Sequence, residues 1–351
     1  MYIVYNSNKN WNTGEGIDMV SMKDIARRCG VSVATVSKAL NGLPDIGEET
    51  RQKICAMAAE MGYMTNSAAR ALKTKRTYNL GVLFVDERRS GLSHEYFSSI
   101  LEGFKQEAEA HGYDITFINS HVGDQPLSYL RHCRYRGLDG VLIACVNFHD
   151  PRVVELVQSN IPVVTIDHIF PDRQAILSDN VDGLETLVHY AYERGHRRIA
   201  FLHGEESSVT KGRLTGFYKA CRELDLEVPE GYVRPCVYHD PACCEKQTAQ
   251  LLQLPEKPTC IIFPDDYSFM GGYNALQEAG LRMPEDVSAL GYDGINLAGL
   301  MHLTTYTQNA VTIGRTSAER LISLVENPGS GTKGPILIHG GLLEGTSVKE
   351  L

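Results

Sequence analysis

Three short amphipathic segments open the patterned part of the chain, with apolar residues at helical spacing. They span residues 22–29, 33–40 and 48–61. Gly30 ends the first segment, and Ser32 is a natural N-cap for the second. Two short helices joined by a tight turn that contains glycine are typical of a helix-turn-helix domain. We assign residues 21–65 to this domain and expect Val36 and Ala39 in its core.

From residue 78 the pattern changes to short apolar, β-branched runs that alternate with helical segments. The runs are LGVLFV, YDITFI, GVLIACV, IPVVTID, RRIAFLHG, TCIIFPDD and VSALGYDG. Strands that alternate with helices predict parallel sheets covered on both faces, and so an α/β core of two doubly wound subdomains. We expect the chain to cross between the subdomains near residues 178–181, near 308–311 and before 334. The expected subdomains are residues 78–179 with 309–334, and 180–308 with 335–351.

Two segments lie outside these folded parts. Residues 1–20 are polar and unpatterned, so we expect a disordered N-terminal extension with Met19 or Met22 as the true start. Residues 66–77 form a hinge and linker that begins with NSAARALK, a good helix former with Asn66 as N-cap. A helix of about two turns is marginal alone in water, so we expect it to need a partner.

The charge of the chain is distributed unevenly. The net charge is -9, but residues 21–79 carry +5 and the residues after them carry -13. A small basic domain on an acidic body indicates that only the first part contacts a polyanion. No apolar run approaches the ~18–20 residues that a membrane span needs, and the N-terminus has no apolar signal core. We therefore expect a cytoplasmic protein that contacts no membrane.

Motifs for catalysis or metal binding are missing from the sequence. It has no Walker loop, H-E-x-x-H, G-x-S-x-G or dinucleotide fingerprint. None of the nine cysteines forms a C-x-x-C pair, which favours reduced thiols over a zinc site or a disulfide framework. The adjacent Cys243 and Cys244 are candidates for redox chemistry, although adjacent cysteines rarely bridge. We expect no enzymatic activity, no metal and no cofactor.

The first domain resembles the DNA-reading domain of the lactose/galactose-repressor (LacI/GalR) family. MKDIARRCGVSVATVSKALNG is similar to the helix-turn-helix of that family, and TRQKICAMAAEMGYMTNSAARAL to its third helix and hinge. In such a domain the second helix lies in the major groove of double-stranded DNA. Its Val33 and Ala34 can make only apolar contacts, for example to thymine methyls, whereas Lys38 can donate to guanine.

Further DNA contacts follow from the same comparison. The short hydrogen-bonding side chains suited to phosphates are Ser32, Thr35, Ser37 and Asn41. In the hinge, the resemblance implies that Leu72 of each subunit wedges into the minor groove and bends the duplex. The hinge candidates are Asn66, Arg70, Leu72 and Lys73.

The body resembles the effector domain of the same family, itself similar to periplasmic sugar-binding proteins. Matching strings include IPVVTID, ILSDNVDGLE, ERGHRRIAFLHG and GRLTGFYKA, and the whole resemblance covers about residues 21–347. It implies a homodimeric transcriptional repressor of a pseudo-palindromic operator, associated with the bacterial nucleoid when bound. A small effector, a sugar or a sugar phosphate, would control it through subdomain closure and hinge-helix order.

Candidate effector contacts lie at the carboxyl ends of strands, where open α/β sheets bind ligands. They are Asp86, Asp167, His168, Asp265 and Asp293, with Arg213 at the start of a helix. The resemblance adds Tyr96, Phe97 and His239, which sit near positions that line the family's pocket. Carboxylates and a guanidinium bind vicinal hydroxyls in pairs, which suits a sugar. Arg213, Asp265 and Asp293 match the family best, although Asp265 stands where the family commonly has asparagine, and Asp266 can cap the helix that follows. A purine is less favoured, because only Tyr96 and Phe97 supply aromatic walls.

Alternatives from other classes stay open. An extracytoplasmic sugar-binding transport protein is disfavoured by the DNA reader and the missing signal sequence. A sugar-metabolising enzyme has no nucleophile, metal or cofactor motif to support it. For the regulator, a sugar that closes the cleft and melts the hinge helices weakens operator binding, which is induction. A sugar with the opposite effect on operator binding gives co-repression.

We predict that operator recognition divides between Lys38 and Leu72. Lys38→Ala should cost roughly 1–3 kcal/mol of operator binding and relax the preference at one base pair per half-site. Leu72→Ala should weaken binding and reduce bending, with little change in half-site preference. Gel shifts on palindromic and scrambled duplexes measure both effects. Equal affinity of the wild type for the two duplexes would contradict both expectations.

Overall fold

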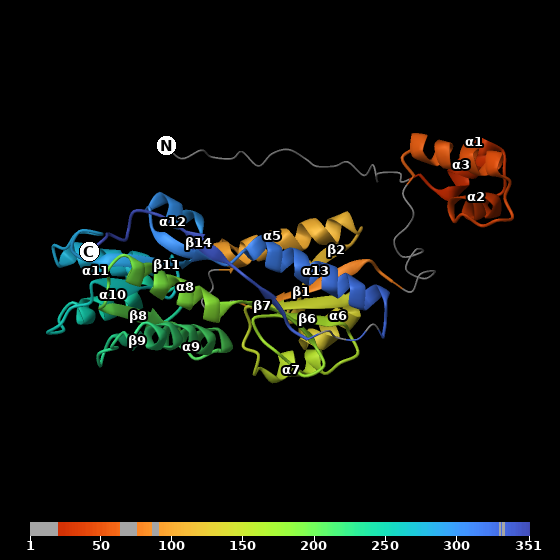
Figure 1. Ribbon diagram of the computed structural model, residues 1–351. Helices are drawn as coiled ribbons and strands as arrows, with labels where there is room; N and C mark the ends of the chain where they lie inside the picture. The colour runs from red at the N-terminus through yellow and green to blue at the C-terminus, as the bar shows by residue number, and fades with distance from the viewer. Residues whose placement is uncertain (1–19, 64–75, 86–90, 330, 332–333) are drawn as a thin grey trace, which may run out of the picture. The chain divides into compact units, whose positions relative to one another are not determined.

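The computed structural model of the chain describes residues 20–63, 76–85, 91–329, 331 and 334–351. The chain divides into two units, residues 1–77 and 78–351 (Figure 1). The expected extension at residues 1–19 and the expected hinge helix at 66–73 lie outside the described residues and stay predictions. Among the described residues, no helix is long and apolar enough to cross a lipid bilayer.

The first unit is a small helical domain around one apolar core. Its described helices are α1 (Met22–Cys29), α2 (Val33–Leu40) and α3 (Glu48–Glu60). Ile25, Val36 and Ile54, one from each helix, are fully buried in this core. Gly30 turns the chain out of α1 with a φ of 71°, a left-handed conformation that glycine adopts at little cost, and the Ser32 side chain caps α2. The predicted helix-turn-helix and third helix are confirmed.

The second unit begins with a sheet of parallel strands in the order β13-β7-β6-β5-β1-β2. The strands are β1 (Asn79–Phe84), β2 (Asp114–Phe117), β5 (Gly140–Ala144), β6 (Val163–Ile166), β7 (Gln174–Ser178) and β13 (Ile336–Ile338). One face packs on α5 (Glu95–Ala110) and α13 (Ala310–Glu326), and the other on α6 (Tyr129–Arg136) and α7 (Pro151–Val157). Strands β1, β5 and β6 are apolar almost throughout because helices cover both of their faces.

A second sheet repeats this arrangement in the order β14-β12-β11-β10-β8-β9. The strands are β8 (Ile199–His203), β9 (Val233–Pro235), β10 (Cys260–Ile262), β11 (Ser288–Asp293), β12 (Thr304–Thr307) and β14 (Gly341–Leu343). All neighbours are parallel except β14, which pairs with β12 in the antiparallel sense. Helices α8 (Asn180–Glu193) and α9 (Ser208–Glu223) cover one face, and α10 (Pro241–Leu251), α11 (Phe269–Glu278) and α12 (Asn296–Leu300) the other.

Short elements complete the described part of the second unit. They are the 3-10 helix η1 (Gly91–Ser93) and the hairpin of β3 (His121–Val122) and β4 (Gln125–Pro126). The two expected doubly wound α/β subdomains are present.

The chain crosses between the two sheets at three places. The first two crossings, between β7 and α8 and between β12 and α13, lie where the sequence predicted them. The third was expected before residue 334, but Ile336 and Leu337 still pair with Ile176 and Leu177 of the first sheet. The chain therefore changes sheet only at residues 339–340, and residues 335–338 belong to the first subdomain. Pro335 looks like a boundary in the sequence, yet it only precedes an edge strand, where proline is tolerated.

Helices α5 and α13 approach each other closely through glycines. A β-carbon added at Gly314 of α13 would collide with the carbonyl oxygen of Ile100 in α5, and one at Gly103 of α5 with that of Val311. Only glycine permits this backbone contact, which packs α13, the helix after the second crossing, against α5 on one face of the first sheet.

We predict that Gly314→Ala lowers the free energy of unfolding by about 1–3 kcal/mol, because the added methyl forces the two helices apart. Gly299→Ala in α12 is the matched control, since a β-carbon there meets nothing within 4 Å. Alanine also favours a helix more than glycine does, so the control should be neutral or stabilising. Urea unfolding measures both variants, and equal loss in the two would contradict the helix contact.

Candidate functional site

Helix α2 separates a buried face from an exposed one. Val36 and Ala39 are buried, as predicted, whereas Val33 is 41% exposed and Ala34 and Lys38 are also exposed. The exposed face therefore presents the residues that were predicted to contact bases.

Polar side chains of α2 have partners within the domain. The Ser32 hydroxyl accepts from the backbone N–H of Thr35 at 3.1 Å, and the Asn41 side-chain amide donates to the carbonyl of Ser37 at 2.6 Å. Lys38 forms an ion pair with Asp45, which sequence analysis missed, and the hydrogen bond from Lys38 lowers the pKa of Asp45. All these contacts lie at or near the surface, where a phosphate or a base can compete for the same donors.

A cavity of about 1310 Å³ opens at the carboxyl ends of the strands of both sheets. The described residues that were predicted to bind an effector all line it: Tyr96, Phe97, Asp167, His168, Arg213, His239, Asp265 and Asp293. Asp86 and the hinge contacts Asn66, Arg70, Leu72 and Lys73 lie outside the described residues. We call this cavity the cleft.

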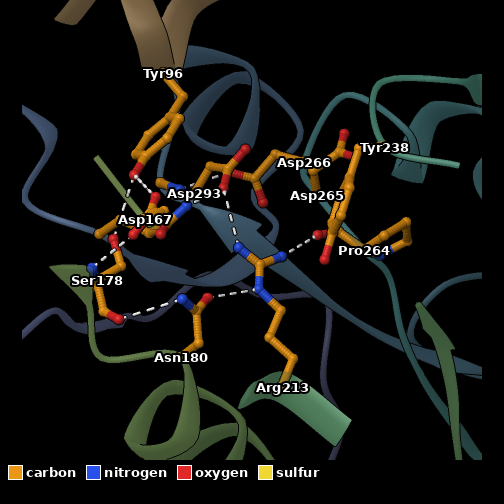
Figure 2. A network of polar contacts seen from close by, with 12 residues as sticks. Tyr96, Asp167, Ser178, Asn180, Arg213, Tyr238, Pro264, Asp265, Asp266 and Asp293 are labelled. Atoms are coloured by element: carbon orange, nitrogen blue, oxygen red, sulfur yellow. Dashed lines mark hydrogen bonds and ion pairs between the residues drawn. The ribbon is translucent and has the colours of Figure 1, made fainter. Parts of the chain in front are cut away.

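Arg213, near the start of α9, is buried at the centre of the cleft wall (Figure 2). Its guanidinium donates to the side chain of Asn180 at 2.9 Å and to the carbonyl of Pro264 at 2.6 Å. The third guanidinium nitrogen lies 4.0 Å from a carboxylate oxygen of Asp293. The guanidinium carbon lies 3.6 Å from the centre of the Tyr292 ring. Burial raises the pKa of Asp293 well above its ordinary value, and Arg213 opposes that rise.

A second carboxylate faces this group from the first subdomain. Asp167, after β6, accepts from the backbone N–H of Ser178 at 2.8 Å and from the Tyr96 hydroxyl at 3.4 Å. Burial raises the pKa of Asp167 as well. Figure 2 shows Tyr96 reaching from α5 toward Asp167 and Asp293, so side chains of both subdomains meet at this point.

The neighbouring acids Asp265 and Asp266 have distinct roles, and one expectation was wrong. Asp266 does not cap the helix after it: its carboxylate accepts from the backbone N–H groups of Gly294 and Ile295 at 2.7 and 3.0 Å, and burial raises its pKa to about 7. Asp265 takes the capping contact, since its carboxylate accepts from the N–H and hydroxyl of Ser268, each at 2.7 Å. Asp265 also lines the cleft, whereas Asp266 shapes the loop behind it.

Four described residues with side chains in the cleft lining hold positive φ angles: 52° at Cys145, 56° at Asp167, 57° at His239 and 112° at Asp293. Residues with side chains rarely adopt such angles, at a cost of roughly 1–3 kcal/mol each. Strain of this kind persists where surrounding contacts fix the backbone, and it gathers at ligand-binding sites.

Aromatic rings line both walls of the cleft, and there are more of them than the sequence predicted. Phe148 stacks on His168 with ring centres 4.3 Å apart, on the side of the first subdomain. His94 stacks on His239 at 4.1 Å across the two subdomains. Burial lowers the pKa of His168, which favours the neutral form of its ring. The sequence signal was weak, because Phe148 and His94 lie in irregular loops.

Comparison with known proteins identifies both units. Residues 78–338 match the model of the periplasmic binding proteins and sugar-binding domain of the LacI family, and residues 21–66 match that of the bacterial regulatory proteins, lacI family. The chain belongs to the LacI family of bacterial regulatory proteins. As a LacI-family member it joins a DNA-binding domain to an effector-binding core.

Individual relatives extend over nearly the whole LacI-family chain. The HTH-type transcriptional repressor PurR of Escherichia coli O139:H28 (strain E24377A / ETEC) is 30% identical over 342 residues, 95% of this chain and 98% of PurR. The lac repressor dimer bound to operator and the anti-inducer ONPF matches with a TM-score of 0.76 and 26% identity, over 94% and 99% of the two chains. A transcriptional regulator CelR–cellobiose complex shares the fold, with a TM-score of 0.68 and 20% identity over 93% and 99%. These relatives are transcription regulators.

We predict that Arg213→Met lowers the free energy of unfolding by about 3–5 kcal/mol at pH 8, because it leaves the buried Asp293 carboxylate without its cation. Burial already raises the folded pKa of Asp293 above its unfolded value. Stability that depends on the protonated acid is therefore present at low pH and lost as pH rises through the folded pKa. The loss in the variant should be smaller at pH 5 than at pH 8 in urea unfolding.

Adding Asp293→Asn to Arg213→Met should recover part of the loss at pH 8, since the carboxylate that faced Arg213 is then replaced by a neutral amide. A loss in Arg213→Met that is equal at both pH values would show that Asp293 is not the group left uncompensated.

Proposed function

We propose that this LacI-family regulator is a homodimeric repressor that releases a pseudo-palindromic operator when a neutral carbohydrate binds the cleft. The observation that carries the proposal is the meeting of Arg213, Asp293 and Asp167 between two subdomains, beside flat aromatic faces. Carboxylates and a guanidinium accept and donate in pairs, which matches the vicinal hydroxyls of a sugar.

The charge of the cleft supports a neutral ligand over a phosphorylated one. Among the described residues, its lining holds more acids than permanent cations: Asp167, Asp265, Asp293, Glu205 and Glu206 against Lys211 and Arg213. Lys211 is already paired with Glu206 at 3.2 Å, and Arg213 with the groups around it. A phosphate would therefore meet net negative charge with no free cation to receive it.

The aromatic faces suit a sugar and leave one rival ligand class. A pyranose ring presents C–H groups on its flat side, and these pack well on aromatic faces such as Phe148 or His168. A flat heteroaromatic ring, such as a purine, is the second candidate, because rings occur on both walls. The rings are stacked on one another, however, and the surrounding carboxylates suit hydroxyl donors better.

Operator binding and dimer formation follow from α2 and from the relatives. The exposed face of α2 carries residues suited to a major groove, and the lac repressor is solved as a dimer bound to operator with an anti-inducer. A dimer places two reading helices at equivalent half-sites. We propose that the protein acts on chromosomal DNA in the cytoplasm, with the predicted hinge at residues 66–77 carrying the signal.

We predict that a neutral sugar found by a melting-shift screen of mono- and disaccharides lowers operator affinity by roughly 5- to 150-fold, the usual range for coupled sites. Asp293→Asn should remove the sugar-dependent melting shift and the release of DNA, while operator binding without sugar stays near wild type. Calorimetry and fluorescence anisotropy on operator DNA measure the two effects.

Asp225→Asn is the matched control, since Asp225 is exposed at the end of α9, outside the cleft lining. Tight binding of a purine with no sugar response would replace the proposed ligand class. A sugar that strengthens operator binding would reverse the sign to co-repression.

A further inference from the structure

Three cysteines lie together beside the wall of the cleft. Cys236 follows β9, and Cys243 and Cys244 lie in the first turns of α10. The sulphur atoms of Cys236 and Cys244 are 3.1 Å apart. Both side chains are buried in the core beneath α10 and α11, whereas Cys243 is half-buried. The sequence alone points only to the adjacent Cys243 and Cys244 as candidates for redox chemistry, because the thiol that contacts Cys244 comes from another element.

Cys236 has the properties of a reactive thiol. The hydrogen bond with Cys244 lowers the pKa of Cys236 to about 7. By contrast, burial raises the pKa of Cys221, in another core of the same subdomain, to about 11. The thiolate is the nucleophile in thiol chemistry, so Cys236 is the more reactive of these groups at neutral pH. Cys243, which is hydrogen-bonded to Cys236, is only half-buried, so the cluster reaches the surface at this thiol.

We propose that Cys236 and Cys244 form a reversible disulfide on exposure to a peroxide, and that this bond weakens ligand binding in the cleft. The effect on ligand binding rests on the proposed function, whereas the formation of the disulfide does not.

The chemistry balances with hydrogen peroxide as the oxidant. The Cys236 thiolate attacks one peroxide oxygen, the O–O bond breaks, and hydroxide leaves and takes up a proton to become water. Cys236 is then a sulfenic acid. The Cys244 sulphur attacks the Cys236 sulphur, the S–O bond breaks, and water leaves with the Cys244 thiol proton. Two thiols lose two electrons in all, and one peroxide is reduced to two waters.

The segment between the two cysteines carries residues of the cleft wall. The Tyr238 ring lies 5.3 Å from the Arg213 guanidinium, and the backbone N–H of His239 donates to Asp265 at 2.8 Å. His239 also stacks on His94 of the other subdomain. A disulfide bond is about 2.05 Å long, so it draws the two sulphurs about 1 Å closer than they are now. In the proposal, the segment between the two cysteines takes up part of this movement, and the contacts at Tyr238 and His239 weaken.

A peptide map tests the bond directly. The full chain carries Cys55→Ser, because Cys55 is exposed and would cross-link copies. After hydrogen peroxide, alkylation of free thiols and digestion without reductant, we expect a peptide pair joined through Cys236 and Cys244, two hydrogens lighter and separated by dithiothreitol. Cys221 should stay alkylated. Recovery of Cys236 as an alkylated thiol, or as an acid without a bond to Cys244, would overturn the proposal.

Two variants serve as controls for the peptide map. Cys221→Ser, the matched buried control, should keep the Cys236–Cys244 bond. Cys244→Ser should remove it and let Cys236 proceed to sulfinic acid, because no thiol resolves the sulfenic acid. The map in the Cys55→Ser background decides the question even when Cys244→Ser fails to fold.

Two readouts test the coupling to the cleft. In hydrogen exchange, the amides of residues 237–240 should exchange faster in the oxidised protein, with or without a ligand. In calorimetry, the sugar from the melting-shift screen should bind the oxidised protein at least about five-fold more weakly, reversibly on reduction. Unchanged exchange or equal affinity would overturn the coupling. Absence of sugar binding in both forms would count against the proposed function alone, since the exchange rates still decide the coupling.

Discussion

Burial of the Arg213 guanidinium is the constraint around which the cleft is built. A cation leaves water at an acceptable cost only when its donors are satisfied and negative charge lies near. The partners come from separate elements: Asn180 begins α8, Pro264 follows β10, and Tyr292 and Asp293 end β11. Because those elements converge at the carboxyl ends of the strands, the same requirement places carboxylates at the mouth of the cleft.

The two subdomains are joined by a narrow set of crossings rather than by a shared sheet. The backbone N–H of Asp179 donates to the carbonyl of Ile338 at 3.1 Å, and the Asn309 side chain donates to the carbonyl of His339 at 2.6 Å. These bonds tie the three crossing segments into one bundle between the two subdomains. A ligand that touches both walls can shift the equilibrium between two cleft conformations by no more than its difference in affinity for them.

One segment of the cleft wall is held by contacts that lie outside the cleft. The segment after β9 is anchored at Cys236, whose N–H donates to the carbonyl of His203 at 2.7 Å, and again at the capped start of α10. Tyr238 and His239 lie between these anchors and contact Arg213 and Asp265. A change at either anchor would therefore reach the contacts of Tyr238 and His239 in the cleft wall.

Sequence by itself determined the helices of the first domain, the alternation of strands and helices, the acids at the strand ends and the arginine near the start of a helix. Those features depend on local periodicity and on the rule that ligands of parallel sheets bind at one edge. Tertiary structure decided the rest. It placed β13 in the first sheet, gave the capping contact to Asp265 rather than Asp266, stacked His94 on His239, and brought Cys236 to Cys244. Apart from the local contact between Asp265 and Ser268, each of these is a contact between different elements. Periodicity says which face of an element is buried, but only packing decides which residue of another element meets it.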